Sequence, residues 1–572
     1  MVYVLAVRPR LLYLTTKQLQ RIAYNKQHVS NIINLTRNFS KHVPKRITTT
    51  DYTKKVALVS GVIIVGSFIS FSHSDYYNLD TIPNVPKQQP SVDKTSAEGK
   101  RMFSTSTSSL VQNPTSKQGV YLLSEDQVSE KLRQFEESYL VNRGRGVTRY
   151  DICQLASNSP IEDDRAEEIV QVQLLQDNNV RASTDWMFFG IFDGHGGWTT
   201  SSKLRDKLIG YVIHELGTIF KTVKGDQQDQ TEEVRLIPNS ATIDQAIKNG
   251  FLKLDHELVN ENIAKLLNEN NKAKAAELLM PALSGSCGLI SFYDTHSKIV
   301  KVAVTGDSRA ILGSFRDNQW TVRQLSIDQT GSNPTEVARI ISEHPDEPKV
   351  IKNGRVLGSL EPTRAFGDCR YKLPASIQEK IYKQFFGKKL PNFLTSPPYV
   401  TAEPVITSTK VNPDNNDFLV MASDGLYEML TNEEIVGLVV KWMEKEKMIK
   451  PQTSIWDIFG TNENKLPQVA DITNDKSSKK PPQGRRFNSS GLFLLEDKNV
   501  STHLIRNALS NGGSKEQTSM LISIPSPVSR RYRDDLTVTV VFFGTDSKGE
   551  DDNGRLEVNV EATGGGKAKP KL

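Results

Sequence analysis

Four aspartates stand at the ends of predicted apolar strands: Asp193, Asp307, Asp424 and Asp534. Each of these acids, taken alone, is more often a turn or surface residue. Strands that repeatedly end in an acid would gather carboxylates at one edge of a sheet, where the charges repel one another unless cations lie between them. The recurrence therefore predicts a site for two divalent cations.

Asp193 begins the segment DGHGG at 193–197, directly after the apolar run WMFFGIF at 186–192. Glycines on both sides of His195 allow the backbone to approach a ligand closely. The carbonyl of Gly194 could then face inward beside the Asp193 carboxylate, a pairing that suits a hard cation. A hairpin turn is the alternative interpretation of an Asp-Gly sequence after a strand.

Composition narrows the choice of metal and of partner. Three cysteines without paired spacing argue against a thiolate zinc site and against a disulfide framework, and the nine histidines are scattered. A carboxylate site selects Mg²⁺ or Mn²⁺. The net charge of +6 is concentrated in residues 1–50, which hold nine Lys or Arg and no acid. The remainder is nearly neutral, so we expect no nucleic-acid partner.

The elements that must position these acids are mainly strands. The run at 186–192 reads as a strand buried on both faces, and 287–304 reads as an antiparallel hairpin with a polar turn. A helix with a capping box is predicted from Ser124 to about Tyr139, and a second helix at 204–220 would pack on a sheet.

The chain divides by composition into five parts. Residues 1–50 have the composition of a mitochondrial presequence, with a basic disordered arm as the alternative. Residues 56–73 are predicted to be a membrane anchor, with a buried core helix as the poorer alternative. Residues 74–118 read as a disordered linker. A catalytic domain is predicted at 119–545, with insertions near 223–280 and 445–500, and a flexible tail at 546–572.

Six ordered motifs carry a family resemblance: IED at 161–163, DGHGG at 193–197, GDSR at 306–309, RAFGD at 364–368, DGLYE at 424–428 and RDD at 533–535. They resemble those of the metal-dependent type 2C protein serine/threonine phosphatases. SNSPIEDDR at 157–165, PPYVTAEP at 397–404, STHLIRNAL at 501–509 and YRDDLTVTVV at 532–541 are most similar to the mitochondrial pyruvate dehydrogenase phosphatase branch.

The resemblance implies an α+β fold, a β-sandwich of two antiparallel sheets with helices on both outer faces. It also implies that Asp193 bridges two Mg²⁺ or Mn²⁺ ions, one of which the Gly194 carbonyl binds. Asp163, Asp368 and Asp534 would be further ligands, Glu162 would act through water, and Asp307 would help hold a weaker third ion. His195 matches the family's general acid; a hydrogen-bonded core histidine is the alternative.

The chain departs from the family pattern at three places. Asn158 stands where many members have a phosphate-gripping Arg, which leaves the phosphate-binding cation unassigned. Asp328-Gln329 replaces a frequent Asp-His, and we assign neither residue a role. Asp424 is expected to be a structural or indirectly acting carboxylate rather than a ligand.

The function implied is a phosphatase that dephosphorylates and reactivates the E1α subunit of the mitochondrial pyruvate dehydrogenase complex. A phosphatase for other mitochondrial phosphoproteins and a catalytically inactive phosphoprotein-binding scaffold are the alternatives. An inner-membrane anchor would place the catalytic part in the intermembrane space, whereas that substrate lies in the matrix. Pro570-Lys571-Leu572 resembles an imperfect peroxisomal address, with an arbitrary tail end as the alternative.

Overall fold

A computed structural model describes residues 121–176, 180–220, 222–224, 233–235, 238–451, 465–473, 492–544 and 556–564. These residues belong to one compact unit. The predicted presequence at 1–50, anchor at 56–73 and linker at 74–118 lie outside the described residues. Within the described ranges, no helix combines the length and the apolar character needed to cross a membrane.

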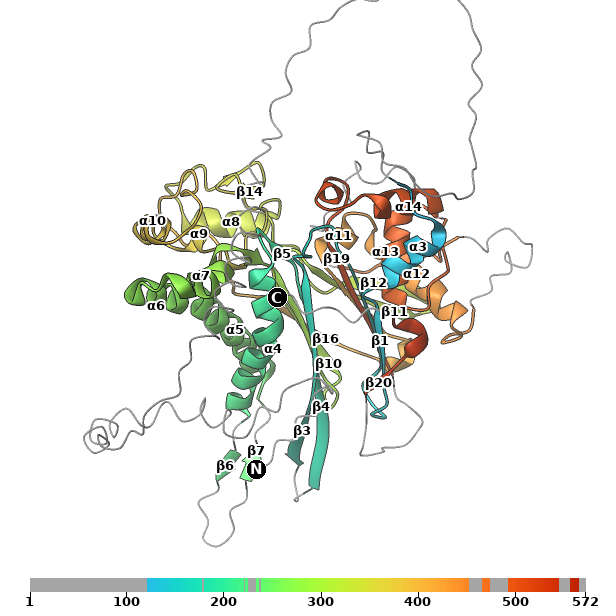
Figure 1. Cartoon of the computed structure of the whole chain (residues 1–572). Helices are drawn as coiled ribbons and strands as arrows, with labels where there is room; N and C mark the ends of the chain where they lie inside the picture. Colours follow the sequence, from blue (N-terminus) through green and yellow to red (C-terminus); the bar gives the residue numbers. More distant parts are fainter. Residues whose placement is uncertain are drawn as a thin grey trace, which may run out of the picture. The chain divides into compact units, whose positions relative to one another are not determined.

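Two sheets form the centre of the described unit (Figure 1). The larger has eight strands among these residues, in the order β18 (Val469–Asp471), β12 (Gln319–Gln324), β11 (Arg309–Arg316), β17 (Phe418–Ala422), β19 (Leu536–Phe543), β2 (Val147–Leu155), β1 (Glu137–Val141) and β20 (Leu556–Val558). The smaller has the order β16 (Val405–Lys410), β10 (Ile299–Thr305), β9 (Gly288–Asp294), β4 (Val180–Phe192) and β3 (Asp164–Gln176). Neighbours are antiparallel except β12 and β18, which are parallel.

The two sheets pack face to face through alternate side chains of their strands. Phe189 of β4 meets Tyr150 of β2, with ring centroids 5.2 Å apart, and Tyr293 of β9 meets Phe543 of β19 at 4.9 Å. Phe188, the neighbour of Phe189, points to the opposite face because successive side chains of a strand alternate. The prediction that 186–192 is buried on both faces is therefore confirmed.

Helices cover both outer faces of the sandwich (Figure 1). On the smaller sheet, α4 (Thr199–Ile219) and α5 (Ser240–His256) share an apolar core with the outer side chains of β4. On the larger sheet, α3 (Glu125–Arg133), α12 (Asn432–Lys445) and α13 (Val500–Ser510) share another with β17 and β19. The predicted fold class, two sheets flanked by helices, is confirmed.

The remaining described elements are short. The helices are η2 (Glu257–Glu261), α6 (Asn262–Glu269), η3 (Lys272–Lys274), α7 (Ala275–Leu283), α8 (Pro334–Glu343), α9 (Cys369–Lys372), α10 (Ala375–Gln384), η4 (Pro413–Asn415), α11 (Asp424–Tyr427), α14 (Lys515–Ser523), η6 (Val528–Arg531) and η7 (Val560–Ala562). The strands are β5 (Gly194–His195), β6 (Thr222–Lys224), β7 (Glu233–Arg235), β8 (Gly285–Ser286), β13 (Ile351–Lys352), β14 (Arg355–Val356) and β15 (Phe366–Gly367).

One predicted helix end needs correction near the start of the unit. The capping box at Ser124 is present, but α3 ends at Arg133 because the next residues leave the helix and pair as strand β1. The segment near 223–280 stays a predicted insertion, but it is not peripheral. Its helix α5 buries Phe251 and Leu254 against α4 and the smaller sheet, and so belongs to the outer helical layer.

Two other segments contribute edge strands to the larger sheet. Within the predicted surface insertion at 445–500, β18 pairs with β12. Within the predicted flexible tail at 546–572, β20 pairs with β1, and the Gly564 N–H donates to the Glu136 carbonyl at 3.2 Å. These pairings order the two short segments, because backbone pairing to a sheet edge can order a segment that has little apolar content of its own. The assignments as an insertion and a tail stay predictions.

His503 of α13 makes folding stability depend on pH. It is fully buried, its Nε2 lies 3.2 Å from the Leu438 carbonyl, and burial lowers its pKa from 6.5 to about 4. Between these values the unfolded chain takes up a proton that the folded chain does not, so stability falls as the pH falls. From pH 7 to pH 5 we expect His503 to cost about 2 kcal/mol. His503→Gln should lack this loss in urea unfolding; equal losses in both proteins would contradict the assignment.

Candidate metal centre and proton donor

A small sheet brings the DGHGG segment beside the RAFGD segment. Strand β8 pairs with β5 on one side and with β15 on the other, so that Gly285 lies opposite both His195 and Gly367. The Cys287 N–H donates to the Asp193 carbonyl at 2.8 Å. The end of β4 is therefore held beside the start of α9, although 173 residues separate His195 from Asp368.

Three carboxylates meet where strands of the two sheets end. Asp193, Asp307 and Asp424 each offer an oxygen, and these oxygens lie within 4.8 Å of one another. Asp193 and Asp307 follow strands of the smaller sheet, and Asp424 follows β17 of the larger one. The convergence predicted from strand ends is present for these three residues. Asp424 was expected to act only indirectly, yet its carboxylate belongs to the same cluster as the other two.

Burial and mutual repulsion raise the pKa values of this cluster. Burial raises the pKa of Asp193 well above its usual range, and the charges of Asp163, Asp424 and Asp307 raise it further. Burial, then the charge of Asp535, raise the pKa of Asp163 to about 8. Burial and Asp424 raise that of Asp307 to about 7. A cation among these oxygens would remove the repulsion.

The donor set fits a hard divalent cation. Carboxylate oxygens favour Mg²⁺ or Mn²⁺, and softer ligands would be needed to favour zinc. Cys287 is the nearby sulfur, but its Sγ donates to Asp307 at 3.1 Å. Burial raises the pKa of this thiol, so it remains protonated and is a poor ligand. The ligand roles predicted for Asp163, Gly194, Asp534 and Glu162 stay predictions.

Cation binding is expected to release protons near neutral pH. Since the pKa of Asp163 is raised to about 8 and that of Asp307 to about 7, these carboxyls are partly protonated in the free protein, and a bound cation must displace the protons. Mn²⁺ affinity should therefore rise with pH from about 6 to about 8. Calorimetry in two buffers of different ionisation heat measures the release, and an affinity independent of pH would contradict this account.

Asp368 contacts His195, in addition to its predicted role as a metal ligand. Its Oδ2 lies 2.7 Å from His195 Nε2. Burial lowers the pKa of His195, but the charge and hydrogen bond of Asp368, together with the charges of Asp307 and Glu162, outweigh burial, and the net pKa is raised. With Nε2 held by Asp368, Nδ1 is the ring nitrogen that can donate a proton to a bound substrate. The ligand role of Asp368 stays a prediction.

Gly285 makes the contact between His195 and Asp368 sterically possible. A Cβ at Gly285 would lie 2.1 Å from His195 Nε2 and 2.4 Å from Asp368 Oδ2. Sequence reasoning missed this residue, because nothing in its neighbours distinguishes it from a turn glycine. The position of β8 between β5 and β15 identifies Gly285 as a residue of the site, and this strand pairing is visible only in the folded structure.

Asp535 organises the loop that carries Glu162 and Asp163, and it was also missed. Its carboxylate accepts the N–H groups of Ser157, Asn158 and Glu162 at 2.5, 2.9 and 2.8 Å, and the Asn158 side-chain amide at 3.1 Å. The amide of Asn158 is thus engaged by Asp535. Asn158 occupies the position of the family's Arg but carries no positive charge.

Two arginines and one glutamine near the carboxylate cluster have defined hydrogen bonds or ion pairs. Arg309 holds Asp328 through Nε at 3.0 Å and Nη2 at 2.5 Å, and Gln329 Oε1 accepts the Gly306 N–H at 2.7 Å. These bonds fix the turn that carries Asp307. The guanidinium of Arg530 contacts Asp534, and its charge opposes the rise that burial causes in the pKa values of Asp193 and Glu162, so its positive charge faces the carboxylates.

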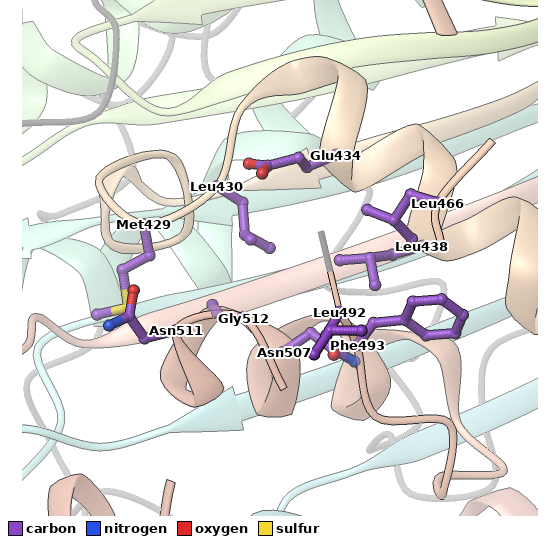
Figure 2. A pocket seen from close by; sticks show the side chains of 11 residues that line it. Met429, Leu430, Glu434, Leu438, Leu466, Leu492, Phe493, Asn507, Asn511 and Gly512 are labelled. Atoms are coloured by element: carbon purple, nitrogen blue, oxygen red, sulfur yellow. The ribbon is translucent and has the colours of Figure 1, made fainter. Parts of the chain in front are cut away.

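A cavity of about 30 Å³ lies elsewhere, in the helical layer over the larger sheet. Figure 2 shows Leu430, Leu438 and Phe493 around it, together with the side chain of Glu434. Glu434 accepts the Thr431 N–H as part of the capping box of α12. None of the carboxylates described above lines this cavity, which has room for about one water molecule.

Sequence comparisons show which known proteins this chain is similar to. The sequence profile of the family named protein phosphatase 2C matches residues 163–455. The chain is 43% identical to the mitochondrial [pyruvate dehydrogenase [acetyl-transferring]]-phosphatase 1 of Saccharomyces cerevisiae, covering 98% of this chain and 96% of that protein. It is 41% identical to a protein phosphatase 2C homologue of Schizosaccharomyces pombe, covering 73% and 85%. It is 30% identical to the human mitochondrial [pyruvate dehydrogenase [acetyl-transferring]]-phosphatase 2, covering 75% and 84%.

Proposed function

This chain belongs to the protein phosphatase 2C family, in the branch of the mitochondrial pyruvate dehydrogenase phosphatases, and on that premise we propose that it hydrolyses phosphoserine on the E1α subunit of pyruvate dehydrogenase. The observation that carries the proposal is the convergence of Asp193, Asp307 and Asp424 beside the His195–Asp368 pair. The carboxylates would supply a cation site and the His195–Asp368 pair a proton donor, the two functions that phosphate-ester hydrolysis requires.

The carboxylates of Asp193, Asp307 and Asp424 would hold Mg²⁺ or Mn²⁺. When bound, such cations supply Lewis-acid chemistry that neutralises phosphate charge and lowers the pKa of a water molecule. His195 would donate a proton from Nδ1 to the departing serine oxygen, while Asp368 keeps the ring oriented through Nε2. Arg530, whose charge already faces the cluster, would attract the phosphate dianion.

The experiment measures phosphate release from phosphorylated E1α and from an unrelated phosphoserine protein, with Mg²⁺, Mn²⁺ or a chelator. We expect metal-dependent release from E1α well above the control protein. Release from both proteins at equal rates would keep the reaction and discard the substrate. Absence of release with either metal would instead favour the inactive scaffold.

We place the protein in the mitochondrion, as the basic residues 1–50 and the mitochondrial assignment of its relatives support. The proposed substrate requires the matrix, whereas an anchor at 56–73 would place the catalytic unit in the intermembrane space. Protease treatment of mitochondria with a ruptured outer membrane distinguishes the two. Digestion of the catalytic unit favours the intermembrane space, and protection favours the matrix.

A further inference from the structure

The turn that carries Asp368 is held in an unusual backbone conformation. Gly367 has φ of +68° and Asp368 has φ of +48°, in the left-handed region that few non-glycine residues occupy. A Cβ at Gly367 would lie 2.3 Å from the Ser284 carbonyl oxygen, so this position is closed to other residues. The surrounding structure must therefore compensate for the strain in the turn.

Asp255, at the end of α5, fixes this turn from the outer helical layer. Its Oδ1 accepts the Gly367 N–H at 2.9 Å. Lys372 Nζ donates to Asp255 Oδ1 at 2.8 Å, to Asp255 Oδ2 at 2.7 Å and to the Ala365 carbonyl at 2.7 Å. The pair thus joins both sides of the turn: Ala365 and Gly367 before Asp368, and α9 after it.

Lys372 has no hydrogen-bond donor left to bind a substrate. An ammonium has three donors, and these three contacts account for all of them. Its side chain is 7% exposed and that of Asp255 is 13% exposed, so both are largely buried. Neither residue belongs to the carboxylate group of Asp193, Asp307 and Asp424. Their contacts reach the site through the backbone that carries Asp368.

We propose that Asp255 and Lys372 are positioning residues that hold Asp368 in hydrogen-bonding reach of His195. The inference rests on the proposed function, because it concerns proton donation to the leaving serine oxygen. Small displacements of a catalytic group can cost as much as a hundredfold in rate. The pair therefore acts on the proton-transfer step through the contact of Asp368 Oδ2 with His195 Nε2, and Mn²⁺ affinity reports separately on the predicted ligand role of Asp368.

The test compares Asp255→Asn and Lys372→Met with the wild-type chain on two substrates, a phosphoserine peptide from E1α and p-nitrophenyl phosphate. Serine oxygen is a poor leaving group that needs the proton, whereas nitrophenolate departs as an anion without it. We expect kcat for the peptide to fall about tenfold or more. KM, kcat for p-nitrophenyl phosphate and Mn²⁺ affinity should stay near wild type.

Asp244→Asn is the matched control, because Asp244 lies on the same helix and makes an equivalent ion pair with buried Lys301 at 2.6 Å. It should leave both activities unchanged. The double variant Asp255→Asn/Lys372→Met should be no slower than the slower single variant, since both residues act through one turn.

Wild-type rates on both substrates in a folded Asp255→Asn variant would overturn the inference while leaving the proposed function intact. Equal losses on both substrates, accompanied by loss of Mn²⁺ binding, would also overturn it, because that result indicates damage to the cation site. A wild-type chain that is inactive on phosphorylated E1α would instead overturn the proposed function, and the inference with it.

Discussion

Asp193→Asn is expected to lose at least about a thousandfold of metal-dependent phosphate release, because cation chemistry supplies several kcal/mol of the rate enhancement and each 1.4 kcal/mol is about tenfold. Asp193 is the carboxylate whose pKa is raised, after burial, by Asp163, Asp424 and Asp307. All three of these neighbours are acids of the site itself, so Asp193 lies at its centre. Its amide analogue would bind a divalent cation far more weakly.

The same substitution should not lower the thermal midpoint of the metal-free protein. Replacing a buried carboxylate by an amide removes like-charge repulsion from the cluster, so stability should stay equal or rise. Asp414→Asn, at an exposed position, is the matched control and should change neither quantity. An active Asp193→Asn variant, or an inactive one that is also unfolded, would contradict the functional interpretation of this residue.

Asp368→Asn is expected to lower kcat on phosphoserine by about a hundredfold. It should also move the alkaline limb of the pH profile to lower pH. Burial lowers the pKa of His195, and the charge and hydrogen bond of Asp368, joined by the charges of Asp307 and Glu162, raise it above its usual value. The protonated imidazole is the proton donor, so activity is lost as the pH rises through this pKa. Removing the charge of Asp368 lowers the pKa and brings the loss to a lower pH.

His195→Gln completes this test. It should slow the phosphoserine reaction about as much as Asp368→Asn, and it should abolish the alkaline limb altogether. The double variant should be no slower than His195→Gln alone, because the two residues form one hydrogen-bonded unit. An alkaline limb that persists unchanged in Asp368→Asn would show that another group donates the proton.

The strands that position the site could be predicted from the sequence, because their apolar patterns are local. The run at 186–192 is buried on both faces, and the hairpin predicted at 287–304 is present as β9 and β10. The acids at strand ends followed from the same pattern. Sequence reasoning alone could therefore assign Asp193 and Asp307 to one cluster.

Contacts that depend on pairing across the fold could not be predicted. Asp534 and Asp535 are adjacent and chemically identical, yet Asp535 accepts the backbone of the loop at 157–162 whereas Asp534 faces Arg530. How closely Asp424 approaches the other acids depends on the distance between the ends of β10 and β17, which is a property of the sandwich. The contacts of Asp255 and Gly285 likewise depend on tertiary packing.

Short edge strands were missed for a related reason. β18 and β20 contain three residues each, and no periodicity can be recognised over that length. They are ordered by the free edges of β12 and β1, which the sequence does not reveal. The helix predicted to reach Tyr139 failed similarly, since the pairing of β1 with β2 overrides local helical preference.

The most direct test of the central claim, that the cluster around Asp193 holds the cations on which hydrolysis depends, is anomalous scattering from crystals of the protein soaked in Mn²⁺. Our account predicts Mn²⁺ ions bonded to the Asp193 carboxylate and shared with Asp307 or Asp424, and no such ions in Asp193→Asn crystals. Full Mn²⁺-dependent activity in a protein whose crystals hold no ion within bonding distance of Asp193 would contradict it.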